Sequence, residues 1–306
     1  MGGGASFVGA MKFGKLETLE GFPDGGFALP GDAPVTERVL SGAGRPWNVR
    51  CGGTMWTVRA WRGSVFQGVP QRAWPEAYGR AFGTIEFNAT HYRIHPADRM
   101  AEWAAGMPEH FRFCAKFPQI ITHFRRFANC EGPTADFIDG LVALGERRGP
   151  SFIQLPPNLG PNKGQALLDY LGQWPRELEV AVEFRHPDWF AGGAEAERVW
   201  EGLEALGVGA VISDTAGRRD AVHMRVTAPF VLIRWGGYDG HPTDPIRLQS
   251  WIDRLGTWFD RGLREAHFLV HQPDSVTTPE TCAAFADRVE AATGTRPVAP
   301  SVLPFA

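Results

Sequence analysis

Hydrophobic and polar residues alternate with a period of two in several short segments of this chain, most clearly at residues 180–185. One side of that segment carries Val180, Val182 and Phe184, and the other carries Ala181, Glu183 and Arg185. Such alternation is typical of a β-strand. The dipeptide His186-Pro187 follows, and proline lacks the N–H that a strand needs. We therefore predict a strand that ends with an acid and a base.

Similar strands recur along the chain and alternate with segments of helical periodicity. The predicted strands are residues 49–56, 84–92, 112–117, 151–155, 179–185, 210–214, 230–235 and 267–271. The predicted helices are residues 71–82, 97–106, 134–148, 163–173, 195–206, 243–259 and 277–294. This order predicts an α/β fold, a (β/α)8 barrel of TIM type, with a doubly wound open sheet as the alternative. Residues 215–229 lack helical periodicity, so irregularity is expected after the sixth strand.

Composition and length set the domain organisation. The first 47 residues are rich in Gly and Pro and are predicted to form an extension that lies on the surface or is partly disordered. Residues 48–296 are assigned to one barrel domain, and residues 297–306 to a C-terminal tail. The length of 306 residues and the 43% hydrophobic content suit a single large core.

Charge and cysteine usage narrow the range of partners. The net charge of −3 gives no general attraction to nucleic acid or to anionic membranes, and no apolar run of about 18 residues predicts a membrane span. The four cysteines show neither CxxC spacing nor a zinc pattern, so reduced thiols in a cytoplasmic protein are expected. A catalytic thiol at Cys51 or Cys114 is the alternative.

The inward-facing positions of the predicted barrel are unusually polar. In a closed barrel every second residue of each strand, that is, one parity of its positions, points inward, and the last inward residues line the mouth. Applying this parity gives Glu86, Asn88, Thr90, Lys116, Gln154, Glu183, Arg185, Arg234 and His271. The direction of Asp214, at the end of the sixth strand, stays open. Buried charges cost several kcal/mol unless paired, so the set is either a self-satisfied ion-pair network or a ligand pocket.

If the pocket is catalytic, Glu183 or Glu86 is the expected general base, and Lys116 is expected to act as a general acid or to form a Schiff base. The excess of cations favours a small anionic ligand, because Arg and Lys match carboxylate and phosphate groups. The residues expected to bind it are Arg185, Arg234, Asn88, Gln154, His271, His186, Tyr92, Gly52 and Gly53. His91 and His123 are expected on loops at the same end.

A divalent-metal site is the alternative reading of this set, with Glu86, Glu183, Asp214 and His271 as ligands. Three cations in the same mouth would repel a metal ion, so no metal and no cofactor is predicted. The oligomeric state is left open by the residues.

Several stretches also match a known sequence pattern. They are WRG at 61–63, TIEFNATHYR at 84–93, FRFCAKFPQIITH at 111–123, FIQLPP at 152–157 and VAVEFRHPDWF at 180–190. Through them the chain from about residue 49 to 294 resembles the YecE-like family, domain of unknown function 72. The resemblance implies a TIM-type barrel and no established activity. The chain departs from the family pattern at Trp-Gly-Gly after Arg234 and at the stretch that begins with His271, so ligands seated on those loops are not carried over.

We hypothesise a metal-independent barrel enzyme, a hydrolase, lyase or isomerase, that acts on a small anionic metabolite such as a sugar phosphate or carboxylate. Two other classes stay open: a non-catalytic ligand-binding or sensing protein, and a metal-dependent barrel enzyme of the nuclease or isomerase kind. The residues alone do not decide whether the protein is an enzyme.

Overall fold

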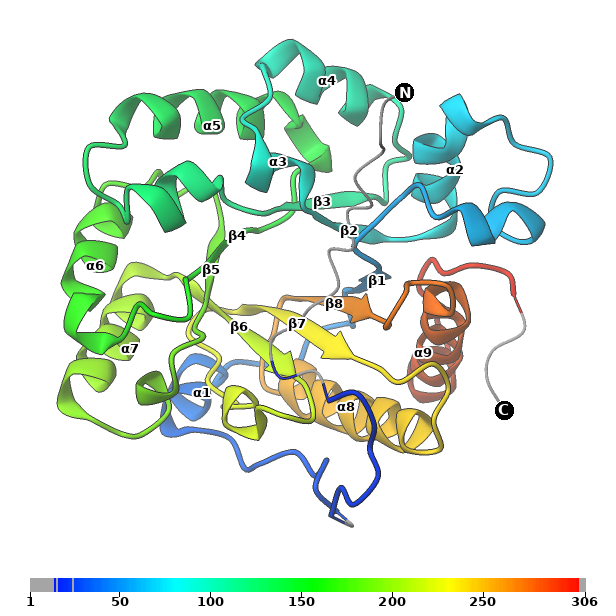
Figure 1. The fold of residues 1–306 in the computed structure, drawn as a ribbon. Coiled ribbons are helices and arrows are strands. Elements are labelled where there is room, and N and C mark those ends of the chain that lie inside the picture. Colours follow the sequence, from blue (N-terminus) through cyan, green and yellow to red (C-terminus); the bar gives the residue numbers. More distant parts are fainter. Residues whose placement is uncertain (1–13, 15, 24, 303–306) are drawn as a thin grey trace.

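Eight parallel strands form the centre of the molecule (Figure 1). The computed structural model describes residues 14, 16–23 and 25–302. The strands are β1 Val49–Gly52, β2 Thr84–Phe87, β3 Arg112–Ala115, β4 Ser151–Gln154, β5 Val180–Glu183, β6 Gly209–Asp214, β7 Phe230–Gly236 and β8 Glu265–His271. Six of them pair in the order β1-β8-β7-β6-β5-β4, and β2 pairs with β3. All strand pairings among the described residues are parallel, as the α/β prediction requires.

The two sheets are connected by sparse contacts on both sides of the β2–β3 pair. Isolated parallel bridges join Phe113 to Arg148 and Lys116 to Phe152, next to β4. On the other side, the Gly83 N–H donates to Cys51 O over 3.1 Å and the Glu86 N–H donates to Gly53 O over 2.9 Å. The strands thus follow one another in chain order. The TIM-type fold is confirmed as barrel-like, with a ladder that is not continuous around the ring.

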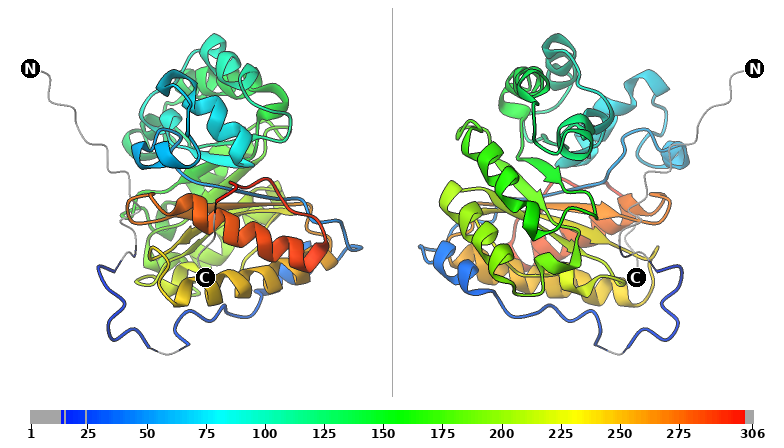
Figure 2. Two further views of the ribbon diagram at one scale, coloured as in Figure 1. Left: turned by 90° about the vertical axis from the view of Figure 1, so that its right-hand side faces the viewer. Right: turned by 60° about the vertical axis from the view of Figure 1, so that its left-hand side comes forward.

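Helices cover the outside of the strands (Figures 1 and 2). They are α1 Pro34–Val39, α2 Trp74–Ala81, α3 Ala89–Tyr92, α4 Ala97–Ala105, α5 Glu131–Ala143, α6 Gly164–Gly172, α7 Ala194–Leu206, α8 Thr243–Asp260 and α9 Thr278–Thr293. Between β6 and β7 the chain forms the short 3-10 helix Arg219–Ala221 instead of an α-helix. This agrees with the predicted irregularity after the sixth strand. No helix in the described part of the chain is long and apolar enough to span a bilayer.

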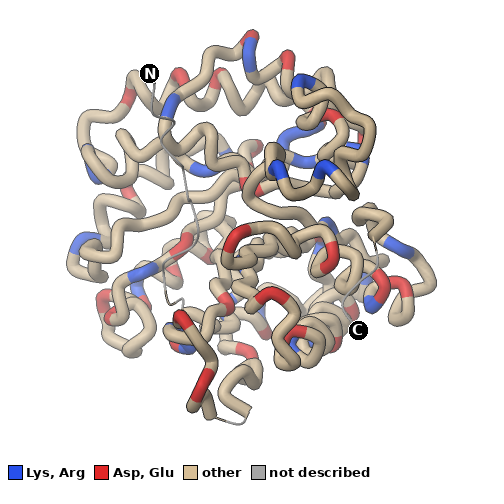
Figure 3. The backbone as a smooth tube through the Cα atoms, turned by 45° about the vertical axis from the view of Figure 1, so that its right-hand side comes forward, with Lys and Arg blue, Asp and Glu red and all other residues tan. Residues whose placement is uncertain are grey.

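The amphipathic pattern of α8 shows why the helices dock where they do. Its apolar residues recur at three- and four-residue intervals and are all buried: Leu248, Trp251, Ile252, Leu255, Trp258 and Phe259. The helix α7 ends at Leu206, and Gly207 caps it in the left-handed conformation with φ +66°. Acidic and basic residues are interspersed along the outer helices and loops (Figure 3), in agreement with the small net charge.

Part of the segment before β1 packs against the barrel. Thr36 is fully buried, and its hydroxyl donates to Met224 O over 2.6 Å and accepts from the Val226 N–H over 2.9 Å. Asp32 forms salt bridges with Arg254 and Arg261 of the α8 region. The segment therefore covers the region between β6 and β7, where the regular helix is missing.

Replacing Gly52 with alanine tests the close approach of β1 and β2. A Cβ at this position would lie 1.8 Å from the Thr84 carbonyl oxygen, and a backbone atom cannot rotate away. We expect a loss of about 3 kcal/mol in the free energy of unfolding, measured by urea denaturation. Gly172→Ala is the control, because a Cβ there meets nothing within 4 Å. A Gly52→Ala protein as stable as this control would contradict the described joint.

Candidate functional site

A layer of polar side chains crosses the interior of the barrel at the carboxyl ends of the strands. We call it the charged layer, and it consists of Glu86, Lys116, Gln154, Glu183, Ser213, Arg234 and His271, all buried. Each lies two residues beyond a less polar inward position. Most of those lower positions form a separate buried cluster of Cys114, Phe152, Ala181, Val211, Ala228, Phe230, Leu232 and Leu269. The inward-facing residues of the strands thus form two layers: this cluster, which we call the apolar floor, and the charged layer above it.

Arg234 lies at the centre of the charged layer and joins its two carboxylates. The guanidinium donates to Glu86 through Nε over 2.9 Å and Nη2 over 3.1 Å, and to Glu183 through Nη1 over 2.6 Å. Burial lowers the pKa of Arg234, but Glu183 and Glu86 raise it by more, so the net shift is upward. This arginine is a fixed positive charge held by two acids.

Glu183 is surrounded by hydrogen-bond donors. Its Oε2 accepts from Gln154 Nε2 over 2.7 Å, and its Oε1 accepts from Ser213 Oγ over 2.8 Å and from Arg185 Nη2 over 3.1 Å. Burial raises the pKa of Glu183, whereas Arg185 and Arg234 lower it, and the result is a pKa of about 2. The carboxylate is therefore ionised at neutral pH, with its oxygens already occupied.

Glu86 is held in a similar way. Asn88 Nδ2 donates to its Oε1 over 3.1 Å, and His271 Nε2 lies 2.8 Å from its Oε2. Burial raises the pKa of Glu86, but Arg234 and His271 lower it well below its ordinary value. An ionised carboxylate can only accept, so His271 is the donor. These contacts give both glutamates a positioning role, and their predicted function as general bases stays a prediction.

Lys116 differs from the other charged residues of the layer. Its side chain follows β3 directly and is only 8% exposed. Within the described ranges, no hydrogen bond or salt bridge is formed by its ammonium group. Burial and Arg234 lower the pKa of Lys116 to about 8, although Glu86 and Glu183 act in the opposite direction. Lys116 thus loses its proton more readily than an ordinary lysine does.

The pKa values of two nearby histidines are lowered by burial and by Lys116: His91, which lies in α3 and not on a loop as predicted, and His123, which lies in a helical turn after β3. His91 Nδ1 lies 2.7 Å from Phe117 O, and its ring centroid lies 5.2 Å from that of His123. A carbonyl only accepts, so Nδ1 of His91 carries the proton. Burial and then Lys116 lower the pKa of His91 to about 3 and that of His123 to about 4. Both rings are neutral at pH 7.

The loop between β3 and α5 has features that the sequence analysis did not identify. Residues Ile120–Phe124 form a π-helical turn, and Arg126, Phe127 and Asn129 adopt φ values of +48°, +70° and +50°. Such backbone geometry is uncommon for residues other than glycine and clusters at functional sites. Phe124 at the end of this turn is 68% exposed, and the predicted binding residue Tyr92, at the end of α3, is 56% exposed. Periodicity in the sequence carries no signal for any of these features.

Of the predicted binding residues outside the charged layer, Arg185 and Asn88 donate to its glutamates, whereas His186, Gly52 and Gly53 contact other parts of the structure. His186 Nδ1 accepts from the Asp188 N–H over 3.2 Å and borders a different cavity, lined also by Asn158 and Gly193. The Gly53 N–H donates to Tyr78 Oη over 2.8 Å, and Gly52 packs on the backbone of β2. The two glycines therefore serve the β1–β2 joint, and the structure does not present them to a ligand.

Asp214 points out of the barrel, toward α8. It accepts from Trp251 Nε1 over 2.7 Å and pairs with Arg247 over 3.0 Å. Ser213 takes the inward position instead. The metal-site alternative that grouped Asp214 with Glu86, Glu183 and His271 is thus wrong in its geometry. Among the residues that the structure describes, no group of three or more His, Cys, Asp and Glu side chains is arranged to hold a metal ion.

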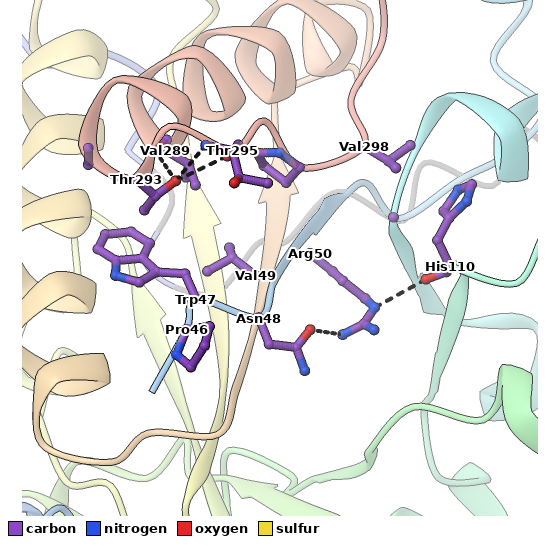
Figure 4. A pocket seen from close by; sticks show the side chains of 13 residues that line it. Pro46, Trp47, Asn48, Val49, Arg50, His110, Val289, Thr293, Thr295 and Val298 are labelled. Carbon is purple, nitrogen blue, oxygen red and sulfur yellow. Dashed lines mark hydrogen bonds between the residues drawn. The ribbon is translucent and has the colours of Figure 1, made fainter. Parts of the chain in front are cut away.

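A cavity of about 550 Å³ lies at the opposite end of the barrel, beside the start of β1 and the end of α9 (Figure 4). Its lining includes Trp47, Asn48, Arg50, Val289 and Thr293. The Arg50 guanidinium is already bound to Asn48 and to His110 O, and it pairs with Glu265. The active ends of TIM-type barrels are the carboxyl ends of the strands, so the charged layer is the stronger candidate site.

Replacing Glu183 with glutamine tests the ion-pair network. The change leaves Arg234 with one carboxylate fewer in a buried site, and we expect a loss of about 3–5 kcal/mol at pH 7 in urea denaturation. The difference from the wild type should shrink as the pH falls from 4.5 towards about 2, where Glu183 itself becomes protonated. Glu146→Gln is the control, because Glu146 is 93% exposed and lies 3.9 Å from Arg147. Equal effects of the two changes would argue against a coupled network.

Replacing Lys116 with methionine tests the unfavourable environment of its ammonium. The folded-state pKa of about 8 lies below the ordinary 10.5, so the charged form destabilises the fold below pH 8. We expect the variant to gain about 1–3 kcal/mol at pH 7. The gain should disappear as the pH rises from about 8 to 10.5, since the amine is then neutral in both states. Lys163→Met, at an exposed site, should change little. A less stable Lys116→Met protein would show that the ammonium is well paired.

The comparisons with known proteins agree with the fold. Residues 50–303 match the model of the family described as protein of unknown function DUF72. The UPF0759 protein YecE of Escherichia coli K12 is 31% identical over 244 residues, which cover 71% of this chain and 89% of that protein. YecE of E. coli O157:H7 matches with the same values.

Solved structures give a similar result. A crystal structure of a DUF72 family protein from Enterococcus faecalis V583 superposes with a TM-score of 0.62 and 16% identity, covering 83% of this chain and 99% of that one. A second structure of that protein gives a TM-score of 0.57. These structures support the fold. The family match over residues 50–303 and the 31% identity to YecE show that the chain belongs to the DUF72 family.

Proposed function

We propose that this protein binds a small anionic molecule at the mouth formed by the carboxyl ends of the strands, and that the ammonium group of Lys116 pairs with the anion. The observation that carries the proposal is the charge balance of the site. Glu86 and Glu183 offset Arg234 and Arg185, with which they form salt bridges. The Lys116 ammonium is left over as one positive charge. A ligand with one negative charge would neutralise it in a partly buried site, where such pairing is strong.

The surroundings of Lys116 favour a small ligand that has a carboxylate or a phosphate ester. His91 and His123 are neutral and offer polar ring atoms without adding charge. The exposed rings of Tyr92 and Phe124 lie at the ends of the short helical segments that follow β2 and β3, where they suit stacking on a sugar or another flat group. A metabolite of sugar size with an acidic group fits this combination.

We assign the acid/base role to Lys116. Its pKa of about 8 lies near the pH of the cell, which is the condition for efficient proton transfer. Glu86 and Glu183 are already hydrogen-bonded by the layer and serve to hold its cations in place. The reaction class that follows is a metal-independent lyase, isomerase or hydrolase reaction.

A non-catalytic binding protein is the second candidate function. The observation that favours it is the saturation of both carboxylates, since Glu183 accepts four hydrogen bonds and Glu86 also accepts four. Native mass spectrometry of the purified protein, before and after long incubation, separates the two functions. A co-purified anion that stays chemically unchanged would favour binding, and its conversion would favour catalysis.

Anion binding can be measured with acetate and inorganic phosphate as probes, by calorimetric titration at low ionic strength. Because a hydrogen bond to a charged group contributes about 1.5–3 kcal/mol, Lys116→Met should weaken binding roughly tenfold or more. Binding to the wild type should also weaken as the pH rises through about 8, where Lys116 loses its charge.

The exposed Lys163 provides the matched control, and Lys163→Met should bind both probes as the wild type does. Probe binding that is unchanged in Lys116→Met, or that is absent from the wild type, would overturn the proposal.

A further inference from the structure

We infer that Lys116 forms an imine with a carbonyl group of the bound molecule, so that the ligand is a small carbonyl compound that also has an acidic group. Oxo acids and open-chain sugar acids or phosphates belong to this class. The inference rests on the proposed function, because it places the reacting carbonyl in the same mouth as the bound anion. It adds a covalent role that electrostatic attraction alone does not require.

The composition of the chain makes a lysine at this place unusual. Of its 31 basic residues, only four are lysines, namely Lys12, Lys15, Lys116 and Lys163. The buried ion pairs of this protein use arginine instead, as Arg234 and Arg247 do. Arginine stays protonated and is not a nucleophile in proteins, whereas a lysine can lose its proton and attack a carbonyl. If the site needed only a positive charge at position 116, an arginine could supply it.

The backbone under Lys116 is held firmly, as a nucleophile requires. The Lys116 N–H donates to Phe87 O over 3.2 Å, and its carbonyl accepts from Thr90 Oγ1 over 2.7 Å. A parallel bridge to Phe152 fixes the other side. The side chain therefore starts from a rigid point between β2 and β4. Sites built on strands are positioned more precisely than sites on flexible loops.

The charged layer also keeps the amine available. Its carboxylates are held by Arg234, Arg185 and polar side chains, and none of them forms a salt bridge with Lys116 in the described part of the chain. A tight carboxylate partner would keep the amine protonated and block the attack. Burial and the nearby Arg234 instead favour the neutral amine, which is the reactive form.

The step needs no oxidant or reductant. The neutral amine attacks the carbonyl carbon, an N–C bond forms as the C=O π bond breaks, and a proton passes from the nitrogen to the oxygen. The resulting carbinolamine loses water and leaves a C=N bond between Lys116 and the ligand. When this imine is protonated it has the same positive charge as the original ammonium, so the charge balance with the bound anion is preserved.

The test uses the full-length protein with glyoxylate and pyruvate as carbonyl probes and sodium cyanoborohydride to reduce any imine. Peptide mapping by mass spectrometry then locates the reduced adduct. We expect modification of Lys116 at least tenfold faster than that of the exposed Lys163 in the same molecule. Comparable modification of Lys116 and Lys163, or faster modification of Lys163, would overturn the inference, because an exposed amine without a site would then react as well.

Lys116→Arg separates the covalent role from the electrostatic one, since it keeps the positive charge and removes the nucleophile. We expect this variant to retain acetate binding within about tenfold and to lose the adduct at position 116. If the wild type binds acetate but forms no adduct at Lys116, the imine is wrong and the anion site stands. If it does neither, both proposals fall. Circular dichroism and thermal unfolding confirm that each variant is folded, and Lys116→Met serves as a second variant without the amine.

Discussion

The bridge that Arg234 makes between Glu86 and Glu183 is the interaction on which the upper half of the barrel depends. Glu86 belongs to the separate β2–β3 pair, whereas Arg234 and Glu183 belong to the six-stranded sheet. The backbone ladder is sparse at both edges of the β2–β3 pair, so side chains complete the connection across the interior. Desolvation of three charges is costly, and the network offsets it only because nearly every donor and acceptor has a partner. The same few atoms thus join the two sheets and form the centre of the charged layer.

The sharp change from an apolar floor to a charged layer follows from strand geometry. Inward side chains two residues apart on each strand fall into successive layers, so one step along every strand moves from Leu232 and Ala181 to Arg234 and Glu183. The floor excludes water from below, which lowers the local dielectric response and strengthens every interaction in the layer above. This environment is also why the pKa of Lys116 falls, because no carboxylate of the layer pairs with it directly.

Parity was sufficient to predict much of this arrangement from the sequence. The strand periodicity placed Glu86, Lys116, Gln154, Glu183, Arg234 and His271 on the inside, and the structure brings them into one layer. It could not decide between Ser213 and Asp214, since both are polar and the register of β6 depends on its neighbours. Parity gives no position for His186, which caps the 3-10 helix Pro187–Trp189 after β5, or for Gly52, whose lack of a side chain allows close packing on β2. The interrupted ladder and the strained loop after β3 depend on tertiary contacts, for which a single sequence has no periodic signal.

An ion-pair network kept only for stability would account for Arg234 and the two glutamates, but it does not account for Lys116. Buried charges retained for stability are expected to be paired, and an unpaired ammonium is replaced at a gain by an apolar side chain of similar length. The layer instead keeps a cation whose folded environment opposes its charge. Proteins accept local destabilisation of this kind mainly where a ligand or a reaction benefits from it. Under the proposed function, the environment that opposes the charge of Lys116 in the fold leaves this charge to a bound anion and favours the reactive neutral amine.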